Sequence, residues 1–221
     1  MDSKAVHELL HYGATVFFSL VREGERSREC ADALVILATE LGNPSRRALG
    51  EFQLGWFDSV TCDRPEGIAR MQRALADFRA TGSVTMMSWF LSLLAQSLGG
   101  FGHYDEALVA IDEALVVIEG TGERFYEAEA HRTKGELLLA KDASNAVQAD
   151  QWFRRAIEIA RGQKARSWEL RATTSLARLL RDTGHRDEAR KLLSRIYNWF
   201  TEGFDTADLK DAKALLDQLS N

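Results

Sequence analysis

The clearest chemical pattern in the sequence is HELLH near the N-terminus, which contains His7, Glu8 and His11. On a helix this spacing places two imidazoles one turn apart with a carboxylate beside them, and zinc peptidases use such a set to bind Zn²⁺ and activate its water. That site also needs a third ligand, but Glu25 and Glu29 fall in a turn and on the next helical segment. Because five-residue patterns also arise by chance, we keep a zinc peptidase only as an alternative and predict no metal ligand.

Other residue types used in catalysis are scattered along the chain. His103, His131 and His185 have no Cys or Ser at a spacing that nucleophilic catalysis needs. The acidic pairs at 105–106 and 187–188 begin helical segments, where they complement the helix dipole. The sequence contains neither a GxxxxGK[ST] phosphate loop nor the alternating strand–helix pattern of a cyclase core. We therefore predict a protein without enzyme activity and without a cofactor.

Composition and charge indicate a soluble helical protein. Of the 221 residues, 45% are hydrophobic and 28% charged, and only two are proline, which favours helix throughout. The N-terminal residues are too polar for a signal peptide, and no window reaches the roughly 18 apolar residues of a membrane span, so we expect a cytoplasmic protein without membrane contact. The two cysteines lack a CxxC spacing, which indicates reduced thiols. A net charge of −5 argues against nucleic-acid binding.

Positive charge is nevertheless concentrated in one segment of this acidic chain. Residues 154–195 contain twelve Lys or Arg against five acids. One interpretation is a set of solvated helix faces that carry ion pairs. The other is a surface that attracts anions. The sequence leaves both interpretations open.

The stretch at 102–122 sets a register that recurs along the chain. Its Ala107, Ile111 and Ala114 are spaced by three and four residues, so they share one face of a helix. Steps of forty residues, with one step of forty-two, reach equivalent apolar or small residues four more times. These equivalents are Ser27, Ala31 and Leu34; Gly67, Met71 and Ala74; Ala149, Phe153 and Ala156; and Ala189, Leu193 and Ile196.

A small residue about twelve positions earlier marks a preceding helix in each repeat, because a small side chain lets two antiparallel helices approach closely. The five small residues are Thr15, Gly55, Ala95, Gly135 and Ala177. We predict one domain, 1–221, that forms an all-α solenoid of five helix pairs, each about 40 residues long, with a C-terminal capping helix. The pairs lie near 4–42, 44–82, 83–122, 123–163 and 165–202, and the cap lies near 205–220.

Glycine and proline mark several predicted helix ends. Gly24 and Gly42 are expected to end the two helices of the first pair, and Pro44 to begin the second pair. The first helices of the third and fourth pairs are expected to begin near Ser83 and Glu123. The aromatic residues of the last two pairs are expected to pack between repeats, and they are Trp152, Phe153, Trp199, Phe200 and Phe204.

These helix pairs resemble tetratricopeptide (TPR) repeats, although a TPR runs about 34 residues. More specifically, much of the chain resembles the TPR-like C-terminal region of bacterial multidomain proteins in which an adenylate/guanylate cyclase domain or a DNA-binding domain precedes a predicted ATPase. The matching segments are GIARMQRALADFRATG at 67–82, GERFYEAEAHRTKGELLLA at 122–140, FRRAIEIARGQKARSWELRATTSLARLLRDTGHRDEARKLL at 153–193 and IYNWFTEGFDTADLKDAKALLDQL at 196–219. The resemblance implies an interaction or regulatory module, because the cyclase and ATPase motifs themselves are absent from this sequence.

The first helices of stacked pairs line a concave groove, so binding residues are expected close to each small residue on those helices. The expected groove is aromatic toward the N-terminus and charged toward the C-terminus, which suits a protein or peptide segment with an apolar anchor and an acidic end. An internal ladder is the alternative for the arginines, in which Arg171 pairs with Glu129. Arg178 would pair with Glu136 in the same ladder. The candidate groove residues are Tyr12, Phe52, Trp56, Trp89, Ser92, Gln96, Arg132, Arg171, Thr174 and Arg178.

The sequence thus predicts a non-catalytic protein-interaction or regulatory scaffold. A second hypothesis is a domain that senses a small-molecule effector for an attached signalling ATPase. A sensor of that kind requires an enclosed, largely apolar pocket near Trp56 and Trp89.

Overall fold

The computed structural model describes residues 3–220 and divides the chain into two compact units, Met1–His103 and Tyr104–Asn221. The described residues form eleven α-helices and one short 3-10 helix, and none of them lies in a β-strand. The predicted all-α fold is therefore confirmed, while the prediction of one domain over 1–221 stays a prediction. Within residues 3–220, no helix combines the length and apolar character that crossing a membrane requires.

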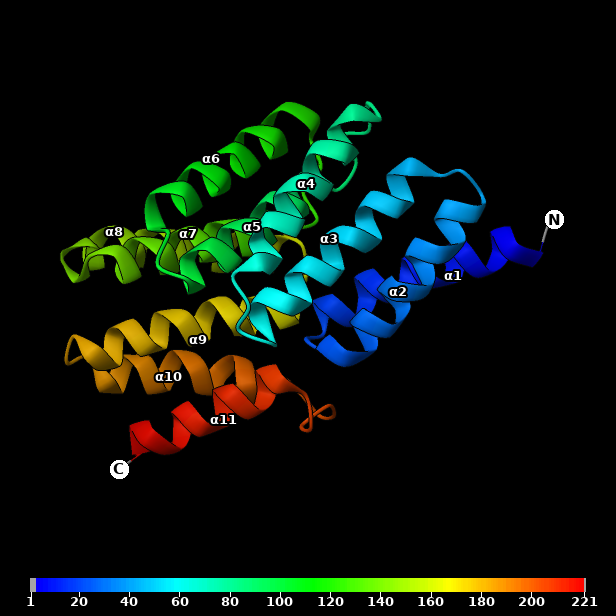
Figure 1. Ribbon diagram of the computed structural model, residues 1–221. Coiled ribbons are helices and arrows are strands. Elements are labelled where there is room, and N and C mark those ends of the chain that lie inside the picture. The colour runs from blue at the N-terminus through cyan, green and yellow to red at the C-terminus, as the bar shows by residue number, and fades with distance from the viewer. Residues whose placement is uncertain (1–2, 221) are drawn as a thin grey trace. The chain divides into compact units, whose positions relative to one another are not determined.

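Unit 1 is a series of five helices in which neighbours along the chain pack against each other (Figure 1). Gly55 and Gly67 bring two of these helices into close contact. A Cβ atom on Gly67 would lie 2.4 Å from the carbonyl oxygen of Gly55, so neither position has room for a side chain. The predicted small residue at Gly55 therefore has the expected role. The five helices are α1 (Ser3–Leu20), α2 (Gly24–Glu40), α3 (Pro44–Val60), α4 (Glu66–Ala80) and α5 (Met87–Gly100).

Unit 2 continues the pattern with a short additional turn. Asp142 accepts a hydrogen bond from the backbone N–H of Ser144 at 2.8 Å, and a 3-10 helix, η1 (Ala143–Asn145), follows. This turn lies in the repeat that is two residues longer than the others. Gly135 again allows close packing, since a Cβ there would lie 2.6 Å from the ring of Phe153. The helices are α6 (Tyr104–Thr121), α7 (Glu127–Lys141), α8 (Ala146–Gly162), α9 (Arg166–Asp182), α10 (Arg186–Tyr197) and α11 (Ala207–Ser220).

The repeat register of the sequence matches the burial of the second helices. Every residue of the register, from Ser27 on α2 to Ile196 on α10, is buried. The Ser27 hydroxyl also donates a hydrogen bond to the carbonyl oxygen of Thr15 at 3.0 Å, which ties α2 to the small position of α1. The helical spacing and the forty-residue step were therefore sufficient to locate the inward-facing stripe of each second helix.

Left-handed backbone conformations recur where second helices end. Gly42 (φ 65°), Gly122 (φ 72°) and Lys164 (φ 57°) follow α2, α6 and α8 at repeat spacing, and this conformation stops a helix. The predicted stop at Gly42 is confirmed. Gly24 is not a stop, because it is the first residue of α2, and Arg22 takes the left-handed conformation (φ 64°) in the turn instead.

Two first helices begin later than predicted. Helix α5 begins at Met87 rather than near Ser83, and α7 begins at Glu127 rather than near Glu123. Met86 has a left-handed φ of 63°, so a right-handed helix cannot run through it. Before α7, the backbone N–H of Glu127 donates to the carbonyl oxygen of Arg124, which closes a turn. In both repeats, the residues between the helices form turns.

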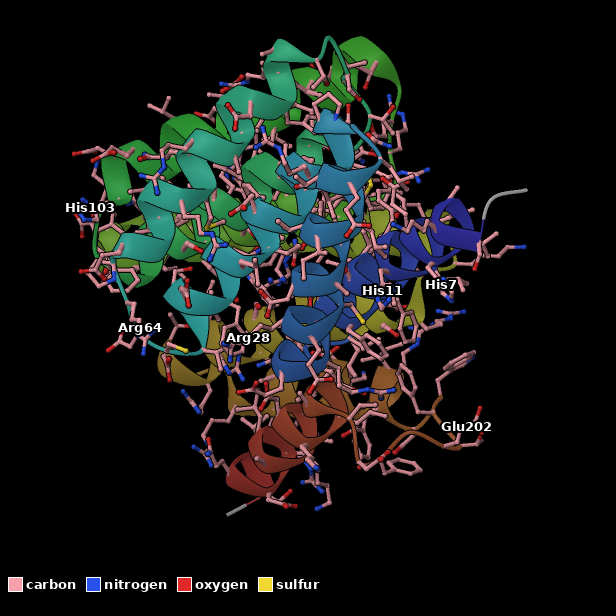
Figure 2. All side chains as sticks on the ribbon, turned by 45° about the vertical axis from the view of Figure 1, so that its right-hand side comes forward. His7, His11, Arg28, Arg64, His103 and Glu202 are labelled. Carbon is pink, nitrogen blue, oxygen red and sulfur yellow. The ribbon has the colours of Figure 1, made fainter. Side chains whose placement is uncertain are left out.

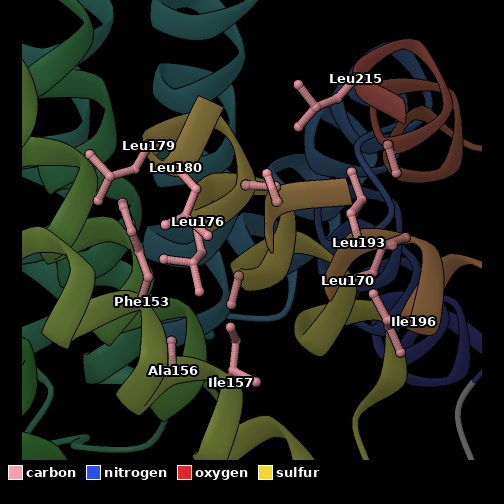
Figure 3. Close-up of a cluster of buried hydrophobic side chains, with 14 of the residues drawn as sticks. Phe153, Ala156, Ile157, Leu170, Leu176, Leu179, Leu180, Leu193, Ile196 and Leu215 are labelled. Carbon is pink, nitrogen blue, oxygen red and sulfur yellow. The ribbon is translucent and has the colours of Figure 1, made fainter. Parts of the chain in front are cut away.

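The core of unit 2 joins α8, α9, α10 and α11 (Figure 3). Phe153, Leu170, Leu193 and Leu215 come from these four helices in order, and each is at most 3% exposed. Helix α11 buries Leu209, Ala212, Leu215 and Leu219 in the same cluster, and the partly buried Leu216 packs against it. It therefore covers the apolar face of the last helix pair, which is what a capping helix does.

Two aromatic residues do not pack as predicted. Trp199 is 56% exposed and Phe204 is 48% exposed. Helix α10 ends at Tyr197, before the predicted end of the fifth pair near 202, and α11 begins at Ala207. Both residues consequently lie in the loop that precedes α11.

Candidate functional site

The HELLH residues do not have the geometry of a zinc peptidase. Figure 2 shows His7 and His11 on α1. Glu8 is only 3% exposed, and its Oε2 accepts a hydrogen bond from Nη1 of Arg46 at 2.6 Å, so the carboxylate faces α3 rather than a metal-bound water. Among residues 3–220, no three His, Cys, Asp or Glu side chains are placed to hold a metal ion. The donor set therefore does not fit the zinc-peptidase alternative.

The aromatic half of the predicted groove lies in the interior of unit 1. Phe52, Trp89 and Ser92 are 0% exposed, and Trp56 is 7% exposed. The ring centroids of Phe52 and Trp89 lie 6.5 Å apart, and those of Phe52 and Phe90 lie 4.6 Å apart in an edge-to-face arrangement. Aromatic contacts of this kind stabilise a core. We assign these residues to the core of unit 1, because this degree of burial does not fit a role in an open groove.

Tyr12 does line a cavity in unit 1, which has a volume of about 350 Å³. Its hydroxyl donates to the sulfur of Met86 at 3.1 Å, and the guanidinium of Arg46 lies 5.6 Å from its ring. Arg46 also lines the cavity, but its charge is compensated by Glu8. Gln96, the remaining unit 1 candidate, is partly buried on α5. Neither candidate, Tyr12 or Gln96, carries a charge, and the charge of Arg46 is compensated, so this cavity offers a partner no uncompensated charge.

In unit 2, the predicted ladder is present around Glu129 on α7. Glu129 is 1% exposed, and it accepts hydrogen bonds from Nε and Nη2 of Arg132 at 3.0 and 3.1 Å. Nη1 of Arg171 on α9 approaches the same carboxylate at 3.4 Å. Burial by itself raises the pKa of Glu129, but the charges of Arg132 and Arg171 outweigh it, so the pKa lies below its usual value. The carboxylate is therefore charged and fully engaged in the interior.

The ladder continues from α9 to the capping helix. Nε of Arg171 contacts Oδ2 of Asp208 on α11 at 2.7 Å, and the two side chains are 13% and 14% exposed. Arg171 thus bridges an acid on α7 and an acid on α11. Asp208 was not predicted from the sequence, although its position one residue before the apolar stripe of the cap placed it near the last helix pair.

The second rung of the predicted ladder does not form. Nη1 of Arg132 contacts Oε1 of Glu136 at 2.6 Å, one helical turn along α7, and the hydroxyl of Ser175 donates to the same oxygen at 2.8 Å. Glu136 is therefore satisfied without Arg178. Arg178 is exposed, and within residues 3–220 it has no ion-pair partner. The pairing of Arg132 with Glu136 follows the i,i+4 spacing and was visible in the sequence.

Arg178 lies at a cavity of about 380 Å³ between α7, the start of α8 and the end of α9. Leu139, Phe153 and Leu179 form apolar walls. The two acids at the cavity are both engaged elsewhere, because Glu136 contacts Arg132 and Asp182 contacts Arg181 at 2.8 Å. The lining residues are Glu136, Leu139, Ala143, Ala146, Phe153, Ser175, Arg178, Leu179, Asp182 and Thr183. The cavity therefore combines apolar walls with one guanidinium whose charge is uncompensated among the described residues.

Thr174 is not part of this cavity. It is 5% exposed, and its hydroxyl donates to the carbonyl oxygen of Leu170 at 2.8 Å, one turn back on α9. Of the four candidates in unit 2, the structure thus places Arg132 and Arg171 in the ladder, Thr174 in the interior and Arg178 at the cavity. The apolar walls escaped sequence reasoning because they come from three helices whose packing no spacing rule specifies.

The fold is that of solved TPR-like proteins. A Rap protein complexed with competence and sporulation factor superposes with a TM-score of 0.67 and 14% identity, covering 99% of this chain and 65% of that one. BtubC (BKLC) from P. vanneervenii gives 0.63 and 17% identity, covering 90% and 88%. Yeast Tom70 gives 0.60 and 15%, covering 96% and 40%. At these identities the similarity shows the fold alone, and that fold is a TPR-like α-solenoid.

Sequence comparison adds one relative of unknown activity. No family model matches the chain. An uncharacterized protein of Rhizobium meliloti (strain 1021) is 33% identical over 126 residues, which make up 57% of this chain and 12% of the relative. The matched segment is thus a small part of a much longer protein.

Proposed function

We propose that this chain is a non-catalytic interaction or regulatory module that binds a protein or peptide segment at the cavity beside Arg178. The observation that carries the proposal is the exposed guanidinium of Arg178, which has no ion-pair partner among residues 3–220 and borders apolar walls. The TPR-like fold supports the same function, since one structural neighbour was solved in complex with competence and sporulation factor. Folds alone do not assign functions, so the cavity carries the argument.

The chemistry of the cavity defines the segment that would fit it. Leu139, Phe153 and Leu179 offer apolar contact to one aliphatic or aromatic side chain. Arg178 offers two parallel N–H donors to a carboxylate. Because Glu136 and Asp182 are already paired with Arg132 and Arg181, they repel an incoming acid less than free carboxylates would. The expected partner is a segment with an apolar residue next to an acidic one.

The proposed cellular setting is regulatory. The sequence resembles the TPR-like C-terminal region of bacterial cyclase-type or transcription-regulator-type ATPases. The match to only 12% of a longer bacterial relative supports a repeat region that works alongside other domains. In that setting the module would report the bound segment to a catalytic or DNA-binding domain.

The effector-sensor hypothesis has less support. It requires an enclosed pocket near Trp56 and Trp89, but the rings of Phe52, Trp89 and Phe90 pack against each other in that region. Trp89 is 0% exposed. A small molecule would have to displace part of this aromatic core, because close-packed interiors have few voids larger than a water molecule.

Peptide selection with the purified chain tests the proposal. A random peptide library is displayed on phage, and the affinity of selected peptides is measured by titration calorimetry. We expect selected sequences to contain an acidic residue beside an aliphatic or aromatic one. Changing Arg178 to Gln removes the charge that holds the carboxylate, so affinity should fall about tenfold or more.

Arg190 provides the matched control, because it is an exposed arginine on α10 that does not line the cavity. Arg190→Gln removes the same net charge and should leave affinity unchanged. The proposed site is wrong if selection yields no specific peptide. It is also wrong if Arg178→Gln and Arg190→Gln bind the selected peptide with equal affinity.

A further inference from the structure

A second basic cavity in unit 2 lies where α8 ends, α9 begins and α10 ends. Its volume is about 400 Å³, and it has no residue in common with the cavity at Arg178. Three arginines, one from each helix, line it together with a single acid. The lining residues are Arg161, Arg166, Glu169, Arg195, Ile196 and Trp199.

The charges of this cavity do not cancel. Glu169 is 4% exposed, and it accepts hydrogen bonds from Nε of Arg161 at 2.6 Å and from Nη1 of Arg166 at 2.5 Å. Arg195 is exposed and has no ion-pair partner within residues 3–220. One carboxylate therefore lines the cavity together with three guanidinium groups. A surplus of positive charge remains in the cavity even though the chain as a whole is acidic.

The arginines keep hydrogen-bond donors for a ligand. A guanidinium has five N–H donors in a planar fork, and Glu169 engages one nitrogen each of Arg161 and Arg166. Their side chains are 46% and 39% exposed, so the remaining donors are accessible from solvent. Glu169 also fixes the positions of these two arginines, which lowers the cost of ordering them around an anion.

Trp199 adds a flat apolar surface to the wall of the cavity. It is 56% exposed, and the guanidinium of Arg166 lies 5.4 Å from its ring centroid. A tryptophan with this exposure stabilises the core less than a buried one does, whereas an exposed indole next to arginines can stack on a planar ring. The same contact to Arg166 holds the indole beside the basic cluster.

We propose that this cavity binds a small phosphorylated molecule that contains a planar ring, a mononucleotide being the representative class. Arginine forks match the geometry of phosphate oxygens, and Trp199 offers a stacking surface for the ring. The volume lies within the range of about 300–1,000 Å³ that is usual for small-molecule sites. Because the two cavities share no lining residue, we expect a ligand to bind here whether or not a segment is bound at Arg178.

Titration of the purified chain with AMP tests the site, using tryptophan fluorescence and calorimetry in parallel. Adenosine supplies the ring without phosphate, and inorganic phosphate supplies the anion without a ring. We expect saturable AMP binding that quenches fluorescence, weaker binding of phosphate by about tenfold, and no detectable binding of adenosine. Phosphate binding as tightly as AMP would overturn the role assigned to Trp199 in holding the ring. Adenosine binding as tightly as AMP would overturn the role assigned to the arginines in holding the phosphate.

Three variants localise the binding. Arg195→Gln and Trp199→Leu should each weaken AMP binding about tenfold by calorimetry, while the exposed Arg190→Gln on the same helix should leave it unchanged. Arg161 and Arg166 are kept, because changing them would leave the buried Glu169 without its partners. Circular dichroism confirms that each variant is folded. Absence of saturable AMP binding, or AMP binding that neither Arg195→Gln nor Trp199→Leu weakens, would overturn the proposal.

Discussion

Arg171 and Arg178 lie two turns apart on α9, yet the structure gives them opposite environments. Arg171 is 13% exposed and bridges Glu129 on α7 and Asp208 on α11. Arg178 is exposed beside an apolar cavity and has no ion-pair partner among the described residues. The two residues show that an arginine on the expected binding face becomes a structural residue when acids from two neighbouring helices reach it. It remains available for a partner only where those acids are absent.

Removal of the capping helix α11, which supplies one of the two acids that hold Arg171, should have the largest effect on stability. Ending the chain at Phe204 removes Leu209, Ala212, Leu215 and Leu219 from the core of unit 2. It also takes Asp208 from Arg171. We expect aggregation or loss of cooperative unfolding in urea, because a terminal repeat without its cap exposes its apolar face.

Lys213→Gln within the intact α11 is the control for that truncation, since the ion pair of Lys213 with Asp217 is exposed. It should change stability by less than about 0.5 kcal/mol. A soluble truncated chain with unchanged urea midpoint would contradict the capping role.

Breaking the ladder at its centre should have the next largest effect. Glu129→Gln removes the carboxylate that Arg132 and Arg171 share in the interior. Because the guanidinium charges stay buried, we expect a loss of about 3 kcal/mol in the free energy of unfolding. The matched control is Glu158→Gln, which breaks an exposed pair with Arg155 at the same i,i+3 spacing and should cost less than about 1 kcal/mol. Equal losses in the two variants would show that burial of the ladder contributes nothing.

Acid pH should lower the stability of the protein through His131, which lies on α7 as Glu129 does. Burial lowers the pKa of His131 from 6.5 to about 4, and the nearby charges of Arg155 and Lys134 add to this effect while Glu127 opposes it. The unfolded chain therefore takes up a proton before the folded chain does, so stability should decline as pH falls from about 6.5 to about 4. The pKa of Glu129 is also lowered, and its contribution should be lost at still lower pH as the carboxylate is protonated.

The free energy of unfolding in urea, measured at pH 7 and pH 5, distinguishes the contribution of His131 from that of Glu129. His131→Asn should show a smaller loss of stability between these two pH values than the unchanged chain does. If both chains lose the same amount, His131 is not the group that titrates in this window.

The smallest effect on stability is expected for Arg178. Arg178→Gln removes no ion pair between described residues, so its free energy of unfolding should stay within about 0.5 kcal/mol of the unchanged chain. A large loss would indicate that Arg178 supports the fold and would return it to the same group as Arg171.

The sequence was informative wherever a residue's environment depends on its own helix. The forty-residue step located the buried stripe from Ala31 to Leu193, and Gly55 marked a close helix contact. The starts of α5 and α7 were predicted too early. The left-handed residue before α5 is Met86, and the turn before Glu127 contains no glycine or proline that would indicate a break in the sequence.

The candidate site was harder to predict because it depends on which helices meet. Phe52 and Trp89 satisfy the spacing of groove residues, but the packing of α3 and α5 turns them into core. The ladder between Glu129 and Arg171 was predicted as an alternative. Asp208 was missed because it lies on the capping helix α11, where the forty-residue register predicts no groove residue. The sequence analysis paired Glu136 with Arg178, but in the structure Glu136 forms an ion pair with Arg132, four residues earlier on the same helix.

The most direct test of the division between the two arginines is the affinity of a library-selected acidic peptide for Arg171→Gln and Arg178→Gln, measured by calorimetry at low salt. The proposed site predicts that Arg178→Gln binds about tenfold more weakly and with a flatter salt dependence, because one fewer charge is screened. Folded Arg171→Gln should bind the peptide as the unchanged chain does, despite its lower stability. Loss of affinity in Arg171→Gln together with unchanged affinity in Arg178→Gln would contradict the account.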